Sequence, residues 1–321
     1  MGKKWLWILS SLVIVVLIIA GIWLIRKPVE PAVTNTTAPE STAKTDTPTT
    51  WTKTGAAVSG QYADADTVKL ADDSYRMYYG IQPEVAGNNF EVYSSTSVDG
   101  KTWTKEAGTR KTMATFPEVV QLVDGKFRMY FQSAGVIKSA ISTDGLSFTD
   151  EAGSRIDKTN DLSLIFDNVA APTVITPSVD GVFTMVYRGT INTPYAGEKV
   201  PNQNTQILLW ATSPDGLTWT KKGLAVDSRT SLYGLADGPE LFTWKDGTTR
   251  LSFWSYAGVF WSTFKDGGFT TPEKVFALAE ATAMNKFPTP TPGDPTYAEF
   301  NDVWYMYYGQ NTSIDYAVAN N

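Results

Sequence analysis

One short phrase that recurs along the chain constrains its fold more than any other feature. The phrase reads Thr-Trp-Thr-Lys in its fullest form, and the aromatic residues of its five copies are spaced by 52, 45, 71 and 50 positions. A period of this length is typical of the blades of a β-propeller. The copies are Thr50–Lys53, Thr102–Lys105, Ser147–Thr149, Thr218–Lys221 and Gly268–Thr270.

Each unit also contains a pair of segments in which apolar residues alternate, as in β-strands. With a third strand such as 206–210 and the aromatic phrase, a unit has four strands. We therefore predict an all-β, five-bladed β-propeller of four-stranded blades, and an open β-sandwich is the alternative. The predicted pairs are 67–70 with 75–79, 119–122 with 127–131, 174–175 with 183–187, 241–242 with 250–254, and 297–298 with 304–308.

The two ends of this repeat region indicate how the ring closes. The last unit ends at 313–318, one strand short, while the first copy of the phrase stands ahead of any blade that could contain it. We predict that residues 50–55 form the outer strand of the fifth blade, which removes an exposed sheet edge. The propeller domain is then 50–321.

The N-terminal part of the chain has a different character. From Trp5 to Ile25 it carries no charge, and these 21 residues at about 1.5 Å each are long enough to span a bilayer core of about 30 Å. We predict a transmembrane anchor at 1–27, the alternative being a cleaved signal peptide. Residues 28–49 are rich in Pro and Thr and predict a disordered stalk. We expect a single-pass protein of the cell membrane whose propeller lies outside the cytoplasm.

Composition excludes several kinds of chemistry. The chain has no Cys and no His, so disulfides, thiolate nucleophiles, Cys/His zinc sites and Ser-His-Asp triads are ruled out. Its formal charge of −6 argues against a nucleic-acid partner. We expect a monomeric domain without a cofactor. A structural calcium ion is compatible with such a fold, but no motif specifies one.

The predicted inner strands begin with segments that align with one another and should face the central funnel. Carboxylates are frequent in them, and carboxylates are among the few side chains left for acid–base chemistry in this chain. The aligned segments are Asp64–Asp66, Phe116–Glu118, Ala171–Thr173, Asp237–Glu240 and Asp294–Thr296.

At these segments the sequence resembles the five-bladed glycosidases, namely the family 43 glycoside hydrolases (arabinanases and xylosidases) and the related invertase and levansucrase families. The resemblance covers roughly residues 50–321. It implies a base or nucleophile in an Asp-Pro of the first blade, a tuning Asp in a middle blade, and an acid in a Glu-x-Pro of a later blade. The expected partner is a poly- or oligosaccharide.

Carried over to this chain, Asp64 matches the first-blade carboxylate, although alanine follows it instead of proline. Asp237 matches the acid with a side chain one methylene shorter, and Ala171 falls where the tuning Asp belongs. A rearranged set is the alternative, with Asp64 or Asp66 as the base and Glu240 or Asp237 as the acid.

Substrate-binding candidates come from the same funnel. Asp66 and Glu118 occupy equivalent strand positions, and each could instead simply accept backbone N–H bonds. Arg188 could contact a sugar hydroxyl or carboxylate, and the insertion 189–206 could shape access to the funnel. Aromatic residues at the ends of second strands could stack on a sugar, although core packing is their competing role. They are Tyr79, Trp254 and Tyr308.

Other repeated residues are interpreted as structural. The Ser-x-Asp-Gly turns at Ser97, Ser142 and Ser213 should form outer hairpins, and the Trp residues of the phrase should pack between blades. The sequence thus favours a membrane-anchored, glycosidase-like propeller that hydrolyses saccharides if it is active. The alternative is a non-catalytic propeller for carbohydrate binding, adhesion or protein interaction.

Overall fold

The computed structural model describes residues 49–82, 85–159, 162–176, 181–194, 204–229, 235–278, 291–310 and 312–320. The predicted anchor and nearly all of the predicted stalk lie outside these residues. In the described part of the chain, no helix is long and apolar enough to cross a membrane. All of the regular elements there are β-strands.

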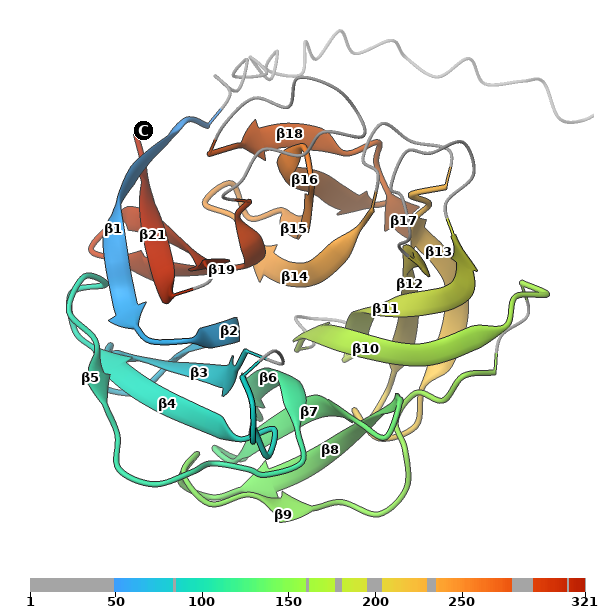
Figure 1. Ribbon diagram of the computed structural model, residues 1–321, viewed down its shortest axis with the longest axis horizontal. Helices are drawn as coiled ribbons and strands as arrows, with labels where there is room; N and C mark the ends of the chain where they lie inside the picture. Colours follow the sequence, from blue (N-terminus) through green and yellow to red (C-terminus); the bar gives the residue numbers. More distant parts are fainter. Residues whose placement is uncertain are drawn as a thin grey trace, which may run out of the picture. The chain divides into compact units, whose positions relative to one another are not determined.

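Five antiparallel sheets are arranged around a central axis, which confirms the predicted five-bladed propeller (Figure 1). In the first three sheets the strands follow one another in chain order outward from the axis. The first blade contains β2 (Tyr62–Lys69), β3 (Tyr75–Ile81), β4 (Val92–Ser97) and β5 (Thr104–Lys105). The second contains β6 (Thr115–Gln121), β7 (Phe127–Ser133), β8 (Val136–Ser142) and β9 (Thr149–Asp150).

The third blade contains β10 (Phe166–Ile175), β11 (Phe183–Pro194), β12 (Asn204–Ser213) and β13 (Thr220–Val226). The fourth contains β14 (Asp237–Thr243), β15 (Thr249–Ser255), β16 (Gly258–Lys265) and β17 (Gly268–Phe269), and β18 (Glu273–Phe276) also pairs with β16. The fifth contains β19 (Gly293–Phe300), β20 (Val303–Gln310), β21 (Ser313–Ala319) and β1 (Trp51–Ser59).

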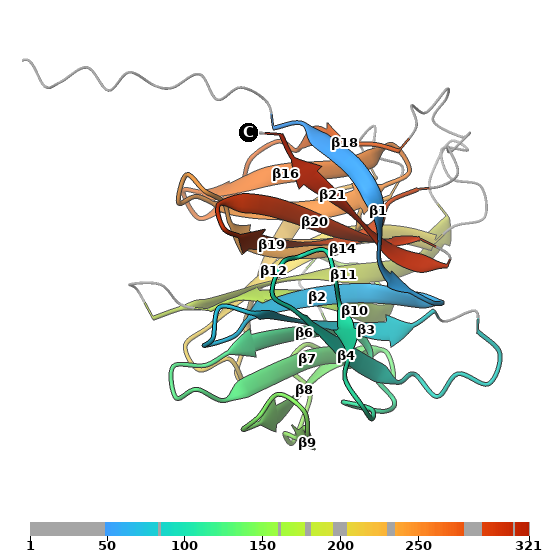
Figure 2. The ribbon, with the colours of Figure 1, turned by 90° about the vertical axis from the view of Figure 1, so that its left-hand side faces the viewer.

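The fifth blade confirms the predicted ring closure. Strand β1 comes from the start of the domain and pairs with β21, with Trp51 opposite Ala319 and Ser59 opposite Ser313 (Figures 1 and 2). Because Ser313 also pairs with Gln310, and Gly309 with Gly293, the start of β19 and the end of β1 share one end of the blade. Strand β1 therefore begins, at Trp51, at one end of the blade, and the inner strand β19 begins at the other end.

A bulge at the same place in every inner strand confirms the alignment of the strand starts. Each inner strand shifts register against its neighbour, and one residue in each bulge has a positive φ. These residues are Asp64 (55°), Phe116 (52°), Ala171 (44°), Gly238 (52°) and Asp294 (44°). Gly238, rather than Asp237, is therefore the fourth-blade equivalent of Asp64.

The Ser-x-Asp-Gly turns have the structural role that was predicted. The Ser97 hydroxyl accepts a hydrogen bond from the Gly100 N–H at 2.9 Å, and the Gly100 carbonyl accepts one from the Tyr307 hydroxyl of the neighbouring blade at 2.8 Å. Trp103 packs edge-on against Tyr307 at 5.3 Å. Equivalent bonds join Tyr78 to Gly145 and Tyr130 to Gly216.

The predicted insertion at 189–206 is in large part an extension of two strands. Strands β11 and β12 stay paired from Gly189 opposite Ile207 to Ile191 opposite Thr205. The third blade therefore projects a longer hairpin at this end, whose tip at 195–203 lies outside the described residues.

Candidate functional site

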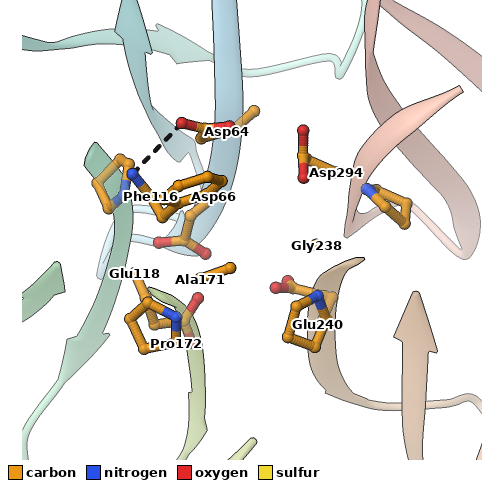
Figure 3. Close-up of a pocket in the computed structure, with 13 residues that line it drawn as sticks. Asp64, Asp66, Phe116, Glu118, Ala171, Pro172, Gly238, Glu240 and Asp294 are labelled. Atoms are coloured by element: carbon orange, nitrogen blue, oxygen red, sulfur yellow. Dashed lines mark hydrogen bonds between the residues drawn. The ribbon is translucent and has the colours of Figure 1, made fainter. Parts of the chain in front are cut away.

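The starts of all five inner strands line one pocket on the central axis (Figure 3). The five bulge residues, Asp64, Phe116, Ala171, Gly238 and Asp294, form what we call the mouth ring. Two residues further along each strand lies a second set, the inner ring, formed by Asp66, Glu118, Thr173, Glu240 and Thr296. The volume of this pocket is about 30 Å³, and the pocket opens to solvent.

The inner ring joins each blade to the next. Asp66 accepts a hydrogen bond from the Val119 N–H at 2.7 Å, and Glu118 accepts one from the Val174 N–H at 2.6 Å. The Thr173 hydroxyl accepts one from Leu241 N–H, and the Thr296 hydroxyl donates to Glu240 at 2.9 Å. Asp66 and Glu118 thus accept hydrogen bonds from backbone N–H groups, the structural role that was the alternative to substrate binding.

Three carboxyl groups of the inner ring lie close together in a buried setting. Oxygens of Asp66, Glu118 and Glu240 lie within 4.8 Å of one another. Burial raises the pKa of Asp66 to about 7. The pKa values of Glu118 and Glu240 are also raised well above their usual range, first by burial and then by the neighbouring Asp66 charge. Oxygen donors of this kind suit calcium, which takes six to eight ligands, so water would have to supply the remainder.

These carboxyl groups predict a dependence of stability on pH. Their folded-state pKa values are raised above the unfolded values of about 4, and that of Asp66 is about 7. The folded protein therefore holds more protons and loses stability as pH rises from about 4 through these raised pKa values. We expect the melting temperature of the full chain to be about 5 °C or more higher at pH 5.5 than at pH 8. Scanning calorimetry tests this. Asp66→Asn should flatten the profile, and an equal or lower melting temperature at pH 5.5 in the parent would contradict the prediction.

In the mouth ring, two aspartates of neighbouring blades face each other. Asp64 accepts a hydrogen bond from the Phe116 N–H at 3.3 Å, and the Asp294 side chain lies on the other side of the same pocket (Figure 3). Burial, followed by the charge of Asp237, raises the pKa of Asp64 to about 7. Burial also raises the pKa of Asp294 well above its usual range, with the charges of Asp64 and Asp237 adding to the effect.

Asp237 lies beside this pair, in an ion pair with Arg188. Their nearest atoms, Asp237 Oδ2 and Arg188 Nη1, are 2.6 Å apart, and the two side chains are only 9% and 11% exposed. The other Asp237 oxygen accepts the Gly238 N–H at 2.8 Å. The Arg188 guanidinium also lies 4.9 Å from the centre of the Phe116 ring. Asp237 thus lies next to the pocket in a buried contact with Arg188 and is not among the residues that line the pocket.

The aromatic candidates separate into two groups. Trp254 lies beside the pocket, since its indole N–H donates at 3.1 Å to Asp294, which lines it. Tyr79 and Tyr308 are fully buried in the apolar clusters between neighbouring blades, with the Tyr79 hydroxyl 2.8 Å from the Ser95 hydroxyl. Core packing is therefore the role of both tyrosines in this structure.

Asp294 was not among the predicted site residues. The signal was present, because Asp294 and Asp64 occupy the same position in the alignment of strand starts. Strand β2 lies beside β19 in the closed ring, so the two aspartates are on neighbouring blades. Gly238 was likewise overlooked, since a glycine offers no side-chain chemistry.

A second, larger hollow of about 690 Å³ lies where β14 and β19 end rather than where they begin. Aromatic residues line much of it, including Trp244 and Trp304, whose ring centres are 4.6 Å apart. Both indoles are more than nine-tenths buried. They pack chiefly against other rings and offer little surface to a ligand.

Comparison with known proteins identifies the fold. No protein-family model matches the chain, and no curated protein is similar to it in sequence. One similar solved structure comes from the GH130 family of mannoside phosphorylases, and its TM-score is 0.62. That family contains glycoside hydrolases that target β-1,2 mannosidic linkages in Candida mannan. The solved structure is 14% identical, with 85% of this chain and 94% of that chain covered.

Two further structures are similar. A glycosyl hydrolase from Bacteroides ovatus gives a TM-score of 0.58 at 14% identity, covering 81% of this chain and 84% of its own. A sucrose-6-phosphate hydrolase from Lactobacillus gasseri gives a TM-score of 0.57 at 12% identity, covering 83% of this chain and 60% of its own. The chain therefore has the propeller fold that these glycoside hydrolases share. At such identities the more specific resemblance to family 43 and to invertases stays a prediction.

Proposed function

We propose that this protein is a glycosidase-like propeller that binds, and in its active form hydrolyses, a poly- or oligosaccharide at the mouth ring. One observation carries the proposal: buried carboxyl groups of three blades, those of Asp64, Asp237 and Asp294, meet at the axial pocket of a fold that glycoside hydrolases use. Hydrolysis of a glycosidic bond needs one carboxyl group as acid and another as base or nucleophile.

The surroundings of two carboxyl groups give them different roles. Asp64 holds a proton in a substantial fraction of molecules at neutral pH, because its pKa is about 7, and it can donate that proton to the leaving oxygen. Asp237, paired with Arg188 beside the pocket, is the candidate to take a proton from the attacking water. This assignment is the reverse of the one that the family resemblance implies.

The size of the pocket limits how a sugar can bind. A space of about 30 Å³ holds a water molecule but not a sugar ring. The ring must therefore lie over the mouth ring, where Ala171 and Gly238 leave room that larger side chains would fill. Trp254, which is only partly buried, offers an aromatic surface at the same place.

A non-catalytic saccharide-binding propeller is the second candidate. The observation that favours it is Ala171, which occupies the mouth-ring position of the third blade and can neither orient nor tune an acid. Such a protein would bind oligosaccharides with the same residues and release no product.

Incubation of the full chain with arabinan, xylan, fructan and β-mannan tests the proposal, with chromatography of the released sugars and calorimetric titration with oligosaccharides as readouts. An enzyme is expected to release reducing sugar from at least one substrate. Binding without product supports the second candidate. A protein that neither binds nor cleaves any of them contradicts both.

The same proposal includes the predicted setting of the domain. We propose that residues 1–27 anchor a monomeric propeller to the outer side of the cell membrane and that Asp66, Glu118 and Glu240 would hold a calcium ion if one binds. Strand β1 begins at the end of its blade remote from the start of the inner strand. Protease added to intact cells should cut within 28–49, and full protection would reverse the topology.

A further inference from the structure

Large side chains adopt an unusual backbone conformation in one region of the propeller. In the described part of the chain, the large residues with a positive φ are Phe90 (53°), Met113 (57°) and Phe116 (52°), and the other non-glycine residues of this kind are Asp, Asn, Ala or Ser. A positive φ is a genuine outlier for a bulky residue. Phe116 belongs to the mouth ring. Phe90 and Met113 together form what we call the apolar lip.

The apolar lip lies at the same end of the propeller as the mouth ring. Phe90 lies between β3 and β4, whose adjoining ends pair at the end of the blade where β2 begins (Figure 2). Met113 is three residues ahead of Phe116, so their Cα atoms are at most about 11 Å apart. The Met113 N–H donates to the Asn89 carbonyl at 3.2 Å, and the Ala114 N–H donates to the Phe90 carbonyl at 3.0 Å. The two segments of the lip therefore lie side by side and flank the mouth ring at the first two blades.

Hydrogen bonds hold the lip in place, yet its side chains face water. The Phe90 N–H donates to Asn88 Oδ1 at 2.5 Å, and Asn88 Nδ2 donates to the Gln82 carbonyl at 3.1 Å. Phe90 is nevertheless 40% exposed, and Met113 is 64% exposed. Burial in a core therefore explains little of why a large side chain is kept in this conformation at Met113. Backbone strain of this kind clusters at ligand-binding sites, and a surface that is already ordered loses less entropy when it binds.

The surroundings of the lip suit a neutral ligand. Beside the lip, Asn89 and Thr112 are exposed and carry an amide and a hydroxyl group. The charged neighbours are already engaged, since Glu91 accepts a hydrogen bond from a tyrosine hydroxyl at 2.6 Å and Lys111 lies 3.1 Å from Asp150. Small-molecule sites combine apolar side chains with a few polar groups. A sugar ring, which has an apolar C–H face and neutral hydroxyl groups at its edge, matches this surface better than a charged ligand does.

We propose that the apolar lip is a second sugar-binding surface, on which further units of a saccharide chain pack after the chain leaves the mouth ring. The Phe90 ring supplies an aromatic surface, and Met113 supplies a flexible apolar side chain beside it. The inference rests on the proposed function of the axial pocket and deepens it. It makes the ligand a saccharide of several units rather than a mono- or disaccharide.

Calorimetric titration of the full chain with the disaccharide and the pentasaccharide of arabinan, xylan, fructan and β-mannan tests the inference. The parent is expected to bind at least one pentasaccharide about tenfold or more tightly than the matching disaccharide, because the lip adds to its affinity. In Phe90→Ala the pentasaccharide affinity should fall about fivefold or more, the order for loss of an aromatic contact. The disaccharide affinity should not change. Val123→Ala, at an exposed apolar residue at the opposite end of the second blade, is the matched control and should bind both as the parent does.

Met113→Gly separates binding from folding. Glycine adopts a positive φ without strain, so the melting temperature should be no lower than that of the parent. The pentasaccharide affinity should fall all the same, because the exposed side chain is gone. A residue with only a structural role would not give this combination.

The outcomes distinguish the lip from the proposed function. Unchanged pentasaccharide affinity in folded Phe90→Ala and Met113→Gly, or equal affinity of the parent for both lengths, would overturn the lip and leave the proposed function standing. If the lip variants weaken binding but Trp254→Ala does not, the lip stands and the site over the mouth ring fails. A parent that binds none of these saccharides contradicts both.

Discussion

A chain that begins at residue 60 is expected to melt about 10 °C or more below one that begins at residue 50, or not to fold at all. The ten extra residues contain strand β1, which covers the edge of β21. They also bring Trp51, whose ring lies 5.8 Å from that of Tyr297 and 5.9 Å from that of Trp261. Loss of a packed Trp alone costs about 3–5 kcal/mol, and about 2–4 °C accompanies each kcal/mol in a domain near this size.

Two controls define that result. Removing residues 1–49 alone should leave a folded propeller, since the pairing of β1 with β21 begins at Trp51. Trp51→Ala in the longer chain should give an intermediate melting temperature. Equal melting temperatures for chains that begin at residues 50 and 60 would show that the blade closes without β1 and would contradict the observed topology.

Asp64→Asn is expected to reduce turnover of a cleaved saccharide by about a hundredfold or more, the usual order for loss of an acid or base. The amide keeps the volume of the side chain but cannot donate a carboxyl proton. Folding should be retained, because burial disfavours the charged form that the substitution removes. Initial rates and melting curves measured side by side test this, with Asp266→Asn as the control that should match the parent in both.

Asp237→Asn should behave differently, and the contrast is informative. It leaves the Arg188 guanidinium buried without its carboxylate, which costs about 3–5 kcal/mol when a buried pair is broken. We therefore expect both lower activity and a lower melting temperature. Equal activity of Asp64→Asn and the parent would remove Asp64 from the mechanism. Unchanged stability of Asp237→Asn would show that the Arg188 pair is not a buried contact in solution.

The repeat was sufficient to predict the architecture. Spacing of the aromatic phrase gave the number of blades, and the missing strand after residue 318 predicted that Trp51 would lie in the last blade. Turn chemistry was equally local, so the role of the Ser97 turn followed from its own four residues. The strands and turns of each unit are specified by residues close together in the chain, so one sequence is enough to predict them.

The site depended on geometry that the sequence does not display. A bulge decides which residue of each inner strand faces the pocket, and it selects Gly238 where the family motif suggested Asp237. Tyr79 and Tyr308 lie two residues before the ends of their strands, and alternation along a strand points both into the packing between sheets. The meeting of Asp64 with Asp294 joins residues of the first and fifth blades, which only ring closure brings together.

The central claim is that a saccharide binds over the mouth ring, and a crystal structure of Asp64→Asn with a bound oligosaccharide tests it most directly. We predict a sugar ring above the axial pocket, in contact with Trp254 and within hydrogen-bonding distance of Asp237, Arg188 or Asp294. A saccharide found only in the hollow beside Trp244 and Trp304, or none in the axial pocket at saturating concentration, would contradict the account.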